Sequence, residues 1–124
     1  ANGHGSARSL AYLYGVLANG GNRNGTHVLA PETIEKARKT ESDGKDLVLG
    51  GIHSKFGLGF MLGTEHINMG PGAGSFGHGG AGGSLGFADP DNKISLGFVM
   101  NQMHPGITAW KTATDVADSV YSKI

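Results

Sequence analysis

A serine, two aspartates and a histidine follow one another in an order that one class of hydrolase uses. Gly82-x-Ser84-x-Gly86 matches the nucleophile-elbow pattern, and Asp89 or Asp91 and then His104 come after it along the chain. That elbow is a strand-to-helix turn, whereas Pro90 predicts a hairpin here. A sheet of that fold also needs more than 124 residues. We therefore favour a structural role, in which small residues let a strand pack closely against a neighbour or ligand.

A second pattern, Gly77-x-Gly79-x-x-Gly82, matches the fingerprint of dinucleotide-binding loops. That fingerprint needs a helix directly after it, because the helix N-terminus receives the pyrophosphate. A predicted strand and a proline turn follow instead. We therefore expect no cofactor.

Histidine is the common residue for proton transfer and metal ligation near neutral pH. The histidines are scattered without ligand spacing, so we expect no metal site. They are His4, His27, His53, His66, His78 and His104. His78 differs, because Gly77 and Gly79 bracket it and would expose one polar side chain and the backbone. An ordinary strand histidine beside bulge glycines explains the pattern equally well.

Composition narrows the class of protein. Ten Lys+Arg balance ten Asp+Glu, which argues against nucleic-acid and anionic-membrane partners. With no Cys, disulfide scaffolds, thiolate zinc sites and cysteine nucleophiles are excluded, and the compartment stays open. No apolar run approaches the roughly 20 residues of a membrane span. The length predicts a single unit over 1–124, and a start without Met predicts a processed or designed piece.

Two segments in the first third predict helices. In 6–19, apolar residues recur at spacings of three and four, Ser6 suits the N-cap, and Gly20 and Gly21 suit the end. In 31–39, Pro31 suits the first helical position. Residues 40–54 read as a polar loop.

The rest of the chain predicts strands and one more helix. Alternation predicts a strand at 55–62, a glycine-dense strand at 75–88 and a return strand at 94–101, with a turn at 89–92. Residues 106–123 predict a helix whose apolar stripe includes Ile107, Trp110 and Ala117. The fold class is therefore α+β, with antiparallel strands flanked by helices.

Taken together, these segments resemble one known family. His78-Gly79-Gly80-Ala81-Gly82-Gly83-Ser84, the turn after it and the strand 94–101 are similar to the C-terminal signature of the serine β-lactamase-related family. That family includes penicillin-binding proteins, class C β-lactamases and related esterases. Segments 6–21, 28–33 and 56–60 resemble the preceding helix, Gly-Gly turn, second helix and strand. The resemblance implies a partial β-lactamase/transpeptidase-like fold, formed by the C-terminal portion of a larger domain.

The resemblance also implies roles for particular residues. His78 would help place the substrate or assist proton movement, and Gly79, Gly80 and Gly82 would line the substrate strand. The backbone N–H of Ala81 would be one oxyanion donor, paired with the N–H of the nucleophilic serine. Preorganised N–H donors beside glycines that permit close approach are what an oxyanion hole requires.

Two family motifs are missing from this chain. No tyrosine is followed two places on by asparagine, so Tyr-x-Asn is absent. Ser42-Asp43-Gly44-Lys45 spells Ser-x-x-Lys, but it falls in the predicted polar loop rather than at a buried helix start. We therefore expect the nucleophile on an upstream portion, and this piece alone to be inactive.

Three hypotheses about function follow. The parent protein is a serine hydrolase that forms an acyl-enzyme with an amide, ester or β-lactam; or the fold is kept for binding or scaffolding; or Ser84 makes the chain a small hydrolase by itself. We favour the first. The expected partners are the N-terminal portion and a small-molecule substrate. Without that portion, the edge at 94–101, the 6–19 helix and Trp110 would lack partners, which predicts self-association or domain swapping.

Overall fold

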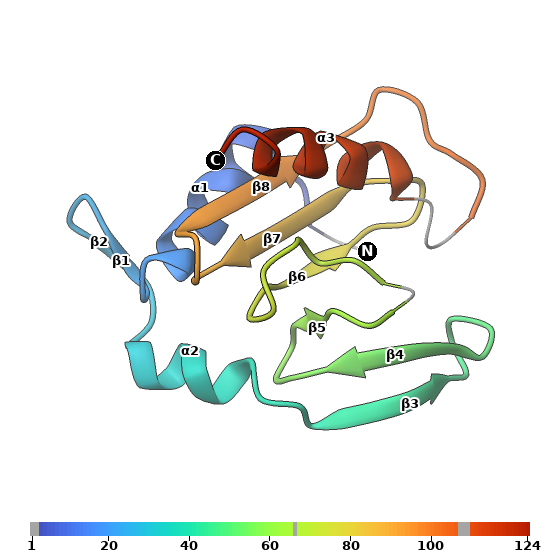
Figure 1. The fold of residues 1–124 in the computed structure, drawn as a ribbon, viewed down its shortest axis with the longest axis horizontal. Helices are drawn as coiled ribbons and strands as arrows, with labels where there is room; N and C mark the ends of the chain where they lie inside the picture. The colour runs from blue at the N-terminus through green and yellow to red at the C-terminus, as the bar shows by residue number, and fades with distance from the viewer. Residues whose placement is uncertain (1–2, 66, 107–109) are drawn as a thin grey trace.

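The computed structural model describes residues 3–65, 67–106 and 110–124. Figure 1 shows a twisted antiparallel sheet with helices packed against it. The helices and strands are α1 (Ala7–Ala18), β1 (Asn22–Arg23), β2 (Thr26–His27), α2 (Pro31–Ala37), β3 (Ser42–Asp46), β4 (Ile52–Phe56), β5 (Met61–Leu62), β6 (Phe76–Gly79), β7 (Leu85–Asp89), β8 (Ile94–Phe98) and α3 (Lys111–Tyr121). The α+β prediction is confirmed.

The main sheet has six strands in the order β3-β4-β5-β6-β7-β8, so each strand pairs with its neighbour in the chain. All of these pairs are antiparallel. Strands β1 and β2 form a separate small hairpin. Among the described strands, β8 has β7 as its one neighbour and therefore forms an edge of the sheet.

The helix predicted at 6–19 is confirmed as α1. The Ser6 side chain accepts a hydrogen bond from the N–H of Ser9, as an N-cap should. At the other end, Gly20 and Gly21 have positive φ and donate to carbonyls of the last helical turn. The small β1–β2 hairpin that follows was not predicted, although its Asn24-Gly25 turn has the positive φ angles typical of such turns.

The prediction of a polar loop at 40–54 is wrong, because this segment forms the β3–β4 hairpin. Strand β3 lies at the edge of the sheet and is largely exposed, so no apolar alternation marks it. The side chain of Asp46 accepts from the N–H groups of Val48 and Leu49 and shapes the turn. The predicted strand at 55–62 is likewise divided, because residues 57–60 form a bend between β4 and β5.

The glycine-dense segment 75–88 is two strands rather than one. Strands β6 and β7 pair through a tight connection at 80–84, where Gly82 and Gly83 have φ angles of 88° and 122°. Such φ angles favour glycine, and they let the chain turn sharply between the end of β6 at Gly79 and the start of β7 at Leu85. The hairpin predicted around the 89–92 turn is confirmed by the pairing of β7 with β8.

Asp89 connects that turn to the last helix. Its carboxylate is fully buried and accepts bonds from the N–H groups of Asp91 and Asn92 and from the Asn92 amide. The hydroxyl of Tyr121 on α3 donates to the same carboxylate at 2.5 Å. Burial opposes ionisation of Asp89, but these hydrogen bonds outweigh it and hold the pKa of the carboxyl below its usual value.

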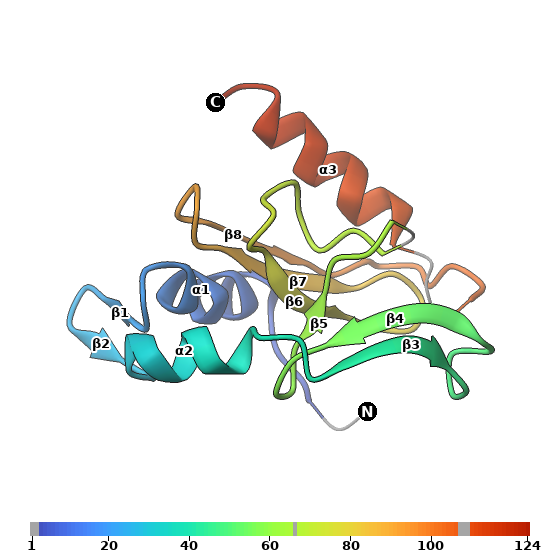
Figure 2. The same cartoon turned by 60° about the horizontal axis from the view of Figure 1, so that its bottom comes forward.

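Helices cover both faces of the sheet. Figure 2 shows α3 on one face and α1 and α2 on the other. The core beneath α3 contains Met61, Ile67, Met69, Leu85, Phe87, Trp110, Ala113 and Ala117. The core beneath α1 and α2 contains Tyr14, Leu17, Ala18, Ile34, Leu62, Phe76 and Ala88. This sandwich fixes the central strand β6 between two apolar layers.

The last helix is shorter than the predicted 106–123. It begins at Lys111, and Ile107 of the predicted stripe lies outside the described residues. The expectation that Trp110 would lack partners is wrong, because its side chain is only 6% exposed and packs in the core under α3. Val120 and Ile124 of the stripe are exposed.

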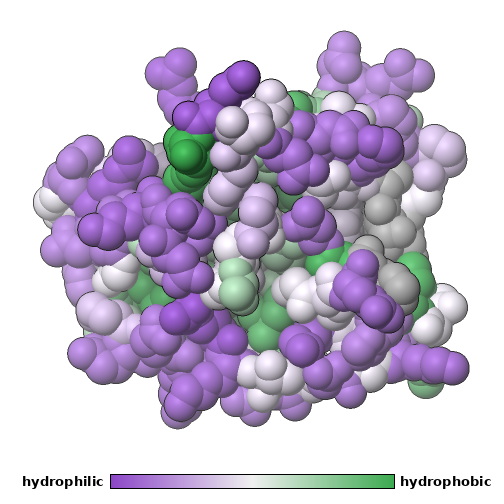
Figure 3. Space-filling view, in the orientation of Figure 1, coloured by the Kyte–Doolittle hydropathy of each residue, from purple (hydrophilic) through white to green (hydrophobic). Residues whose placement is uncertain are grey.

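The face of the molecule seen in Figure 3 is mostly polar. Figure 3 shows hydrophilic side chains over most of one face, with hydrophobic groups in small separate areas. Within the described residues, none of the helices has the length and apolar character needed to cross a bilayer.

Candidate active site

The predicted site residues lie where β6 ends and turns toward β7. His78 is the third residue of β6 and its side chain is exposed. Ala81 is exposed in the connection that follows. In the paired strands, His78 lies opposite Gly86 and Gly79 lies opposite Leu85. The structure therefore brings His78 and Ala81 to one accessible end of a central strand.

The tautomer of His78 follows from its hydrogen bond. Its Nδ1 atom lies 2.7 Å from the carbonyl oxygen of Gly79. Because a carbonyl oxygen can only accept, Nδ1 carries the hydrogen, and in the neutral ring Nε2 keeps a lone pair. The ring of Phe56 lies beside it, with 6.1 Å between centroids. His78 can thus present Nε2 as an acceptor while its other nitrogen is held by the backbone.

The glycines around His78 serve internal packing. A Cβ on Gly77 would overlap the backbone of β7, and one on Gly79 would overlap the indole of Trp110. The same indole donates from Nε1 to the carbonyl oxygen of Gly80 at 2.9 Å. Packing against Trp110 therefore explains why position 79 is a glycine, and no ligand is needed to explain it. This agrees with the alternative in which small residues let a strand pack closely against a neighbour. A contact of Gly79 and Gly80 with substrate stays a prediction.

The connection that carries Ala81 is tied down on both sides. Gly80 donates to Ser84 across it at 2.8 Å, and Gly83 donates to Gly80 at 3.2 Å. Gly82 donates to Gly106 and accepts from the N–H of His104, at 3.2 and 2.9 Å. Within the described part of the chain, the N–H of Ala81 has no backbone acceptor. A rigid peptide with a free donor at the surface is what anion stabilisation requires.

Neither serine motif has the local geometry that its nucleophile motif requires. Ser84 is followed directly by β7, so it does not lie on a strand-to-helix elbow. Ser42 and Lys45 are three residues apart in the extended strand β3, where side chains alternate between faces, and they therefore point to opposite sides. In the structure this motif lies in a strand rather than in the predicted loop, and the side chain of Lys45 points away from Ser42.

A histidine–aspartate pair that sequence reasoning missed lies on the β3–β4 hairpin. His53 Nε2 is 2.5 Å from an oxygen of Asp43, and Lys55 is 3.2 Å from the other oxygen. The hydrogen bond from His53, followed by that from Lys55, lowers the pKa of the Asp43 carboxyl. In the hairpin register Asp43 lies opposite Lys55, and His53 is two residues from Lys55 on the same strand, so the pair depends on a hairpin that the loop prediction missed. No cluster of three metal-ligating side chains occurs among the residues that the structure describes.

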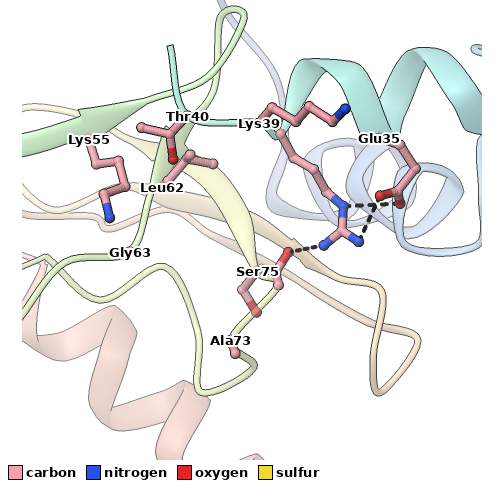
Figure 4. Close-up of a pocket in the computed structure, with 10 residues that line it drawn as sticks. Glu35, Lys39, Thr40, Lys55, Leu62, Gly63, Ala73 and Ser75 are labelled. Carbon is pink, nitrogen blue, oxygen red and sulfur yellow. Dashed lines mark hydrogen bonds and ion pairs between the residues drawn. The ribbon is translucent and has the colours of Figure 1, made fainter. Parts of the chain in front are cut away.

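A charged pocket of about 310 Å³ opens beside the other end of β6 (Figure 4). Its lining includes Arg38 and Lys55, but not His78. Arg38 binds Glu35 and also donates to the carbonyl oxygen of Gly74 at 3.1 Å. Since Lys55 is paired with Asp43, two of the three cations that line the pocket have carboxylate partners, and the third is Lys39. The pocket is separate from the predicted site.

Known proteins resemble this chain over nearly its whole length. The profile of the family described as Beta-lactamase matches residues 1–118. Esterase/beta-lactamase LipL of Mycobacterium tuberculosis is 34% identical over 103 residues, which are 83% of this chain and 23% of that protein.

Solved structures share the fold. A family VIII carboxylesterase superimposes with a TM-score of 0.88 at 33% identity, covering 97% of this chain and 32% of that one. A penicillin-binding protein homologue from Caulobacter crescentus gives 0.89 at 34% identity, covering 96% and 32%. EstA from Arthrobacter nitroguajacolicus Rue61a gives 0.76 at 29% identity, covering 94% and 32%. The chain thus spans about a third or less of these relatives. The profile match over residues 1–118, the identity to a curated relative and the shared fold show that the chain belongs to the beta-lactamase family.

Proposed function

We propose that the protein containing this chain is a serine hydrolase that forms an acyl-enzyme with an amide, ester or β-lactam. The observation that carries this proposal is the exposed His78 at the end of β6, beside an exposed peptide N–H at Ala81. Relatives described as an esterase/beta-lactamase, a carboxylesterase and a penicillin-binding protein homologue support the reaction class.

In the proposed reaction, Ala81 acts through its backbone. When the serine attacks, the carbonyl oxygen of the substrate gains negative charge and needs donors at about 2.7–3.1 Å. The N–H of Ala81 supplies one, and the N–H of the nucleophilic serine supplies the other. The hydrogen bonds around Gly80 and Gly82 keep the Ala81 peptide oriented before substrate arrives.

His78 places the substrate or assists proton movement. Its Nε2 lone pair can accept a hydrogen bond or a proton, while the bond from Nδ1 to Gly79 fixes the ring. In this proposal substrate lies along the backbone of Gly79, Gly80 and Gly82, whose side-chain positions are already covered by Trp110, Ser84 and Met103. These residues complete the part of the site that this chain contributes.

The nucleophile in this proposal lies on a Ser-x-x-Lys outside the 124 residues, in an N-terminal portion of the same protein. This chain is then the C-terminal portion of a larger domain and is inactive alone. The open edge of β8 supports a missing neighbour. The isolated chain should therefore self-associate or swap domains, and a clean monomer in sedimentation at high concentration would contradict this.

Covalent labelling tests the proposal. The longer encoded protein and the 124-residue chain are each incubated with a fluorophosphonate and, separately, with a reactive penicillin, and intact masses are measured. We expect an adduct on the longer protein and none on the chain. An adduct mapped to Ser84 or Ser42 of the isolated chain would overturn the assignment of the nucleophile.

The alternative is a binding or scaffold protein that keeps the fold without the chemistry. An upstream region without Ser-x-x-Lys, together with a folded longer protein that takes no label, would select this alternative.

A further inference from the structure

Apolar side chains from the end of strand β4 and from the loop after β8 flank the segment His78–Gly82. The ring of Phe56, at the end of β4, lies beside the ring of His78. On the other side, Met103 lies across Gly82: a Cβ on that glycine would be 2.6 Å from the Met103 methyl carbon. Phe56 is half-buried and also packs against the core beneath α3, whereas Leu58, two residues later, is exposed.

The position of Met103 is fixed by the backbone on either side of the contact. Gly82 donates to Gly106 and accepts from the N–H of His104, so the loop after β8 is bound to the β6–β7 connection. The positive φ of Gly82 disfavours any side chain there, which leaves the space to the thioether. Met103 is nevertheless 66% exposed, so its apolar surface is available to a ligand.

These contacts determine which side chains would lie beside the groups attached to the reacting carbonyl of a substrate. A substrate whose carbonyl oxygen is bound by the Ala81 N–H would lie along the segment His78–Gly82. Phe56 and Met103 flank that segment, and thioethers and aromatic rings favour alkyl groups. Lys55, next to Phe56, and Lys111, at the start of α3, are each paired with an aspartate.

We propose that Met103 and Phe56 are specificity-determining residues that favour esters with an apolar, uncharged acyl group over β-lactams that carry a carboxylate. This inference rests on the proposed function, because it uses the Ala81 N–H as the oxyanion donor. It goes beyond that function by naming the preferred substrate class and by attributing the preference to two side chains.

The test uses the longer encoded protein with p-nitrophenyl acetate and p-nitrophenyl hexanoate, which share a leaving group and differ in acyl length, and with nitrocefin. We expect kcat/KM for the hexanoate to exceed that for the acetate by about tenfold, since burying two of its four additional methylene groups gives a factor of this size. Nitrocefin should be the poorest substrate of the three.

Met103→Ser should lower the hexanoate-to-acetate ratio at least about fivefold, and Met103→Lys should raise relative activity on nitrocefin. Leu47→Ser is the matched control. Leu47 is 90% exposed on the β3–β4 turn, outside the proposed site, and its loss should leave the ratio unchanged.

Two results would refute the inference in different ways. Turnover of both esters with a ratio near one, or a ratio that Met103→Ser does not change, overturns the specificity assignment and leaves the hydrolase proposal standing. A folded protein that turns over none of the three substrates and takes no covalent label overturns the hydrolase proposal, and the specificity assignment with it.

Discussion

The hydrogen bond from Tyr121 to Asp89 should be a main attachment of the last helix to the sheet. Tyr121→Phe removes one hydroxyl and keeps the ring. Hydrogen bonds to charged groups contribute about 1.5–3 kcal/mol. Because Tyr121 is only half-buried, whereas Asp89 is fully buried, we expect a loss of about 2 kcal/mol in the free energy of unfolding.

The assay is urea unfolding of the 124-residue chain at low protein concentration, followed by the fluorescence of Trp110, its one tryptophan. With a urea dependence of about 1–3 kcal/mol per molar for a small protein, the midpoint should fall by about 1 M. Tyr12→Phe is the control. The Tyr12 hydroxyl bonds the hydroxyl of Thr26 at 2.9 Å in an exposed, neutral pair, so its loss should cost less than about 0.5 kcal/mol.

The penalty of Tyr121→Phe should also depend on pH. Burial, the bond to Asp89 and the nearby charge all raise the pKa of Tyr121, so the hydroxyl stays protonated and can donate. The pKa of Asp89 is lower in the folded chain than its unfolded value of about 3.9. Its stabilising contribution is therefore complete above that value and is lost as pH falls through the folded pKa. A loss below about 0.5 kcal/mol at pH 7, or one no larger than that of Tyr12→Phe, would refute the reasoning.

Further predictions concern packing and capping. Gly79→Ala should destabilise the chain by about 1–3 kcal/mol in thermal unfolding, because the new methyl group overlaps Trp110; Gly44→Ala, where the space is open, is the control and should be near neutral. Ser6→Ala should cost about 1 kcal/mol through loss of the N-cap bond, and an unchanged melting temperature would contradict this. Phe87→Ala should cost about 3–5 kcal/mol, because that side chain is fully buried; a loss below 1 kcal/mol would contradict the position assigned to it in the core.

Local chemistry was sufficient to predict some elements of this fold. Ser6 marked the start of α1, and the Asp89 turn marked the β7–β8 hairpin, because caps and turns depend on a few adjacent residues. Strand β3 escaped prediction because an edge strand exposed on both faces carries no apolar alternation. The division of 75–88 was also missed, because the sequence pattern does not show which glycines adopt positive φ.

The candidate site was only partly predictable for a similar reason. The glycines around His78 pointed to an unusual strand, and the structure places that histidine at the surface. Their cause, however, is Trp110, about 30 residues later in the chain, which the pattern around His78 does not reveal. The position of Met103 beside Gly82 likewise depends on two backbone hydrogen bonds between distant loops.

The contact between α1 and β8 has a consequence for how the chain is made. The hydroxyl of Ser95 donates to the carbonyl oxygen of Ala11, and Gly97 lets the helix backbone approach the strand closely. These partners lie 84 residues apart, while the main-sheet strands pair with their neighbours in the chain. At about 5–20 residues per second, a ribosome needs several seconds to deliver β8 after α1. During translation the apolar face of α1 therefore stays exposed until β8 has been synthesised. We expect chaperone binding to be strongest in that interval.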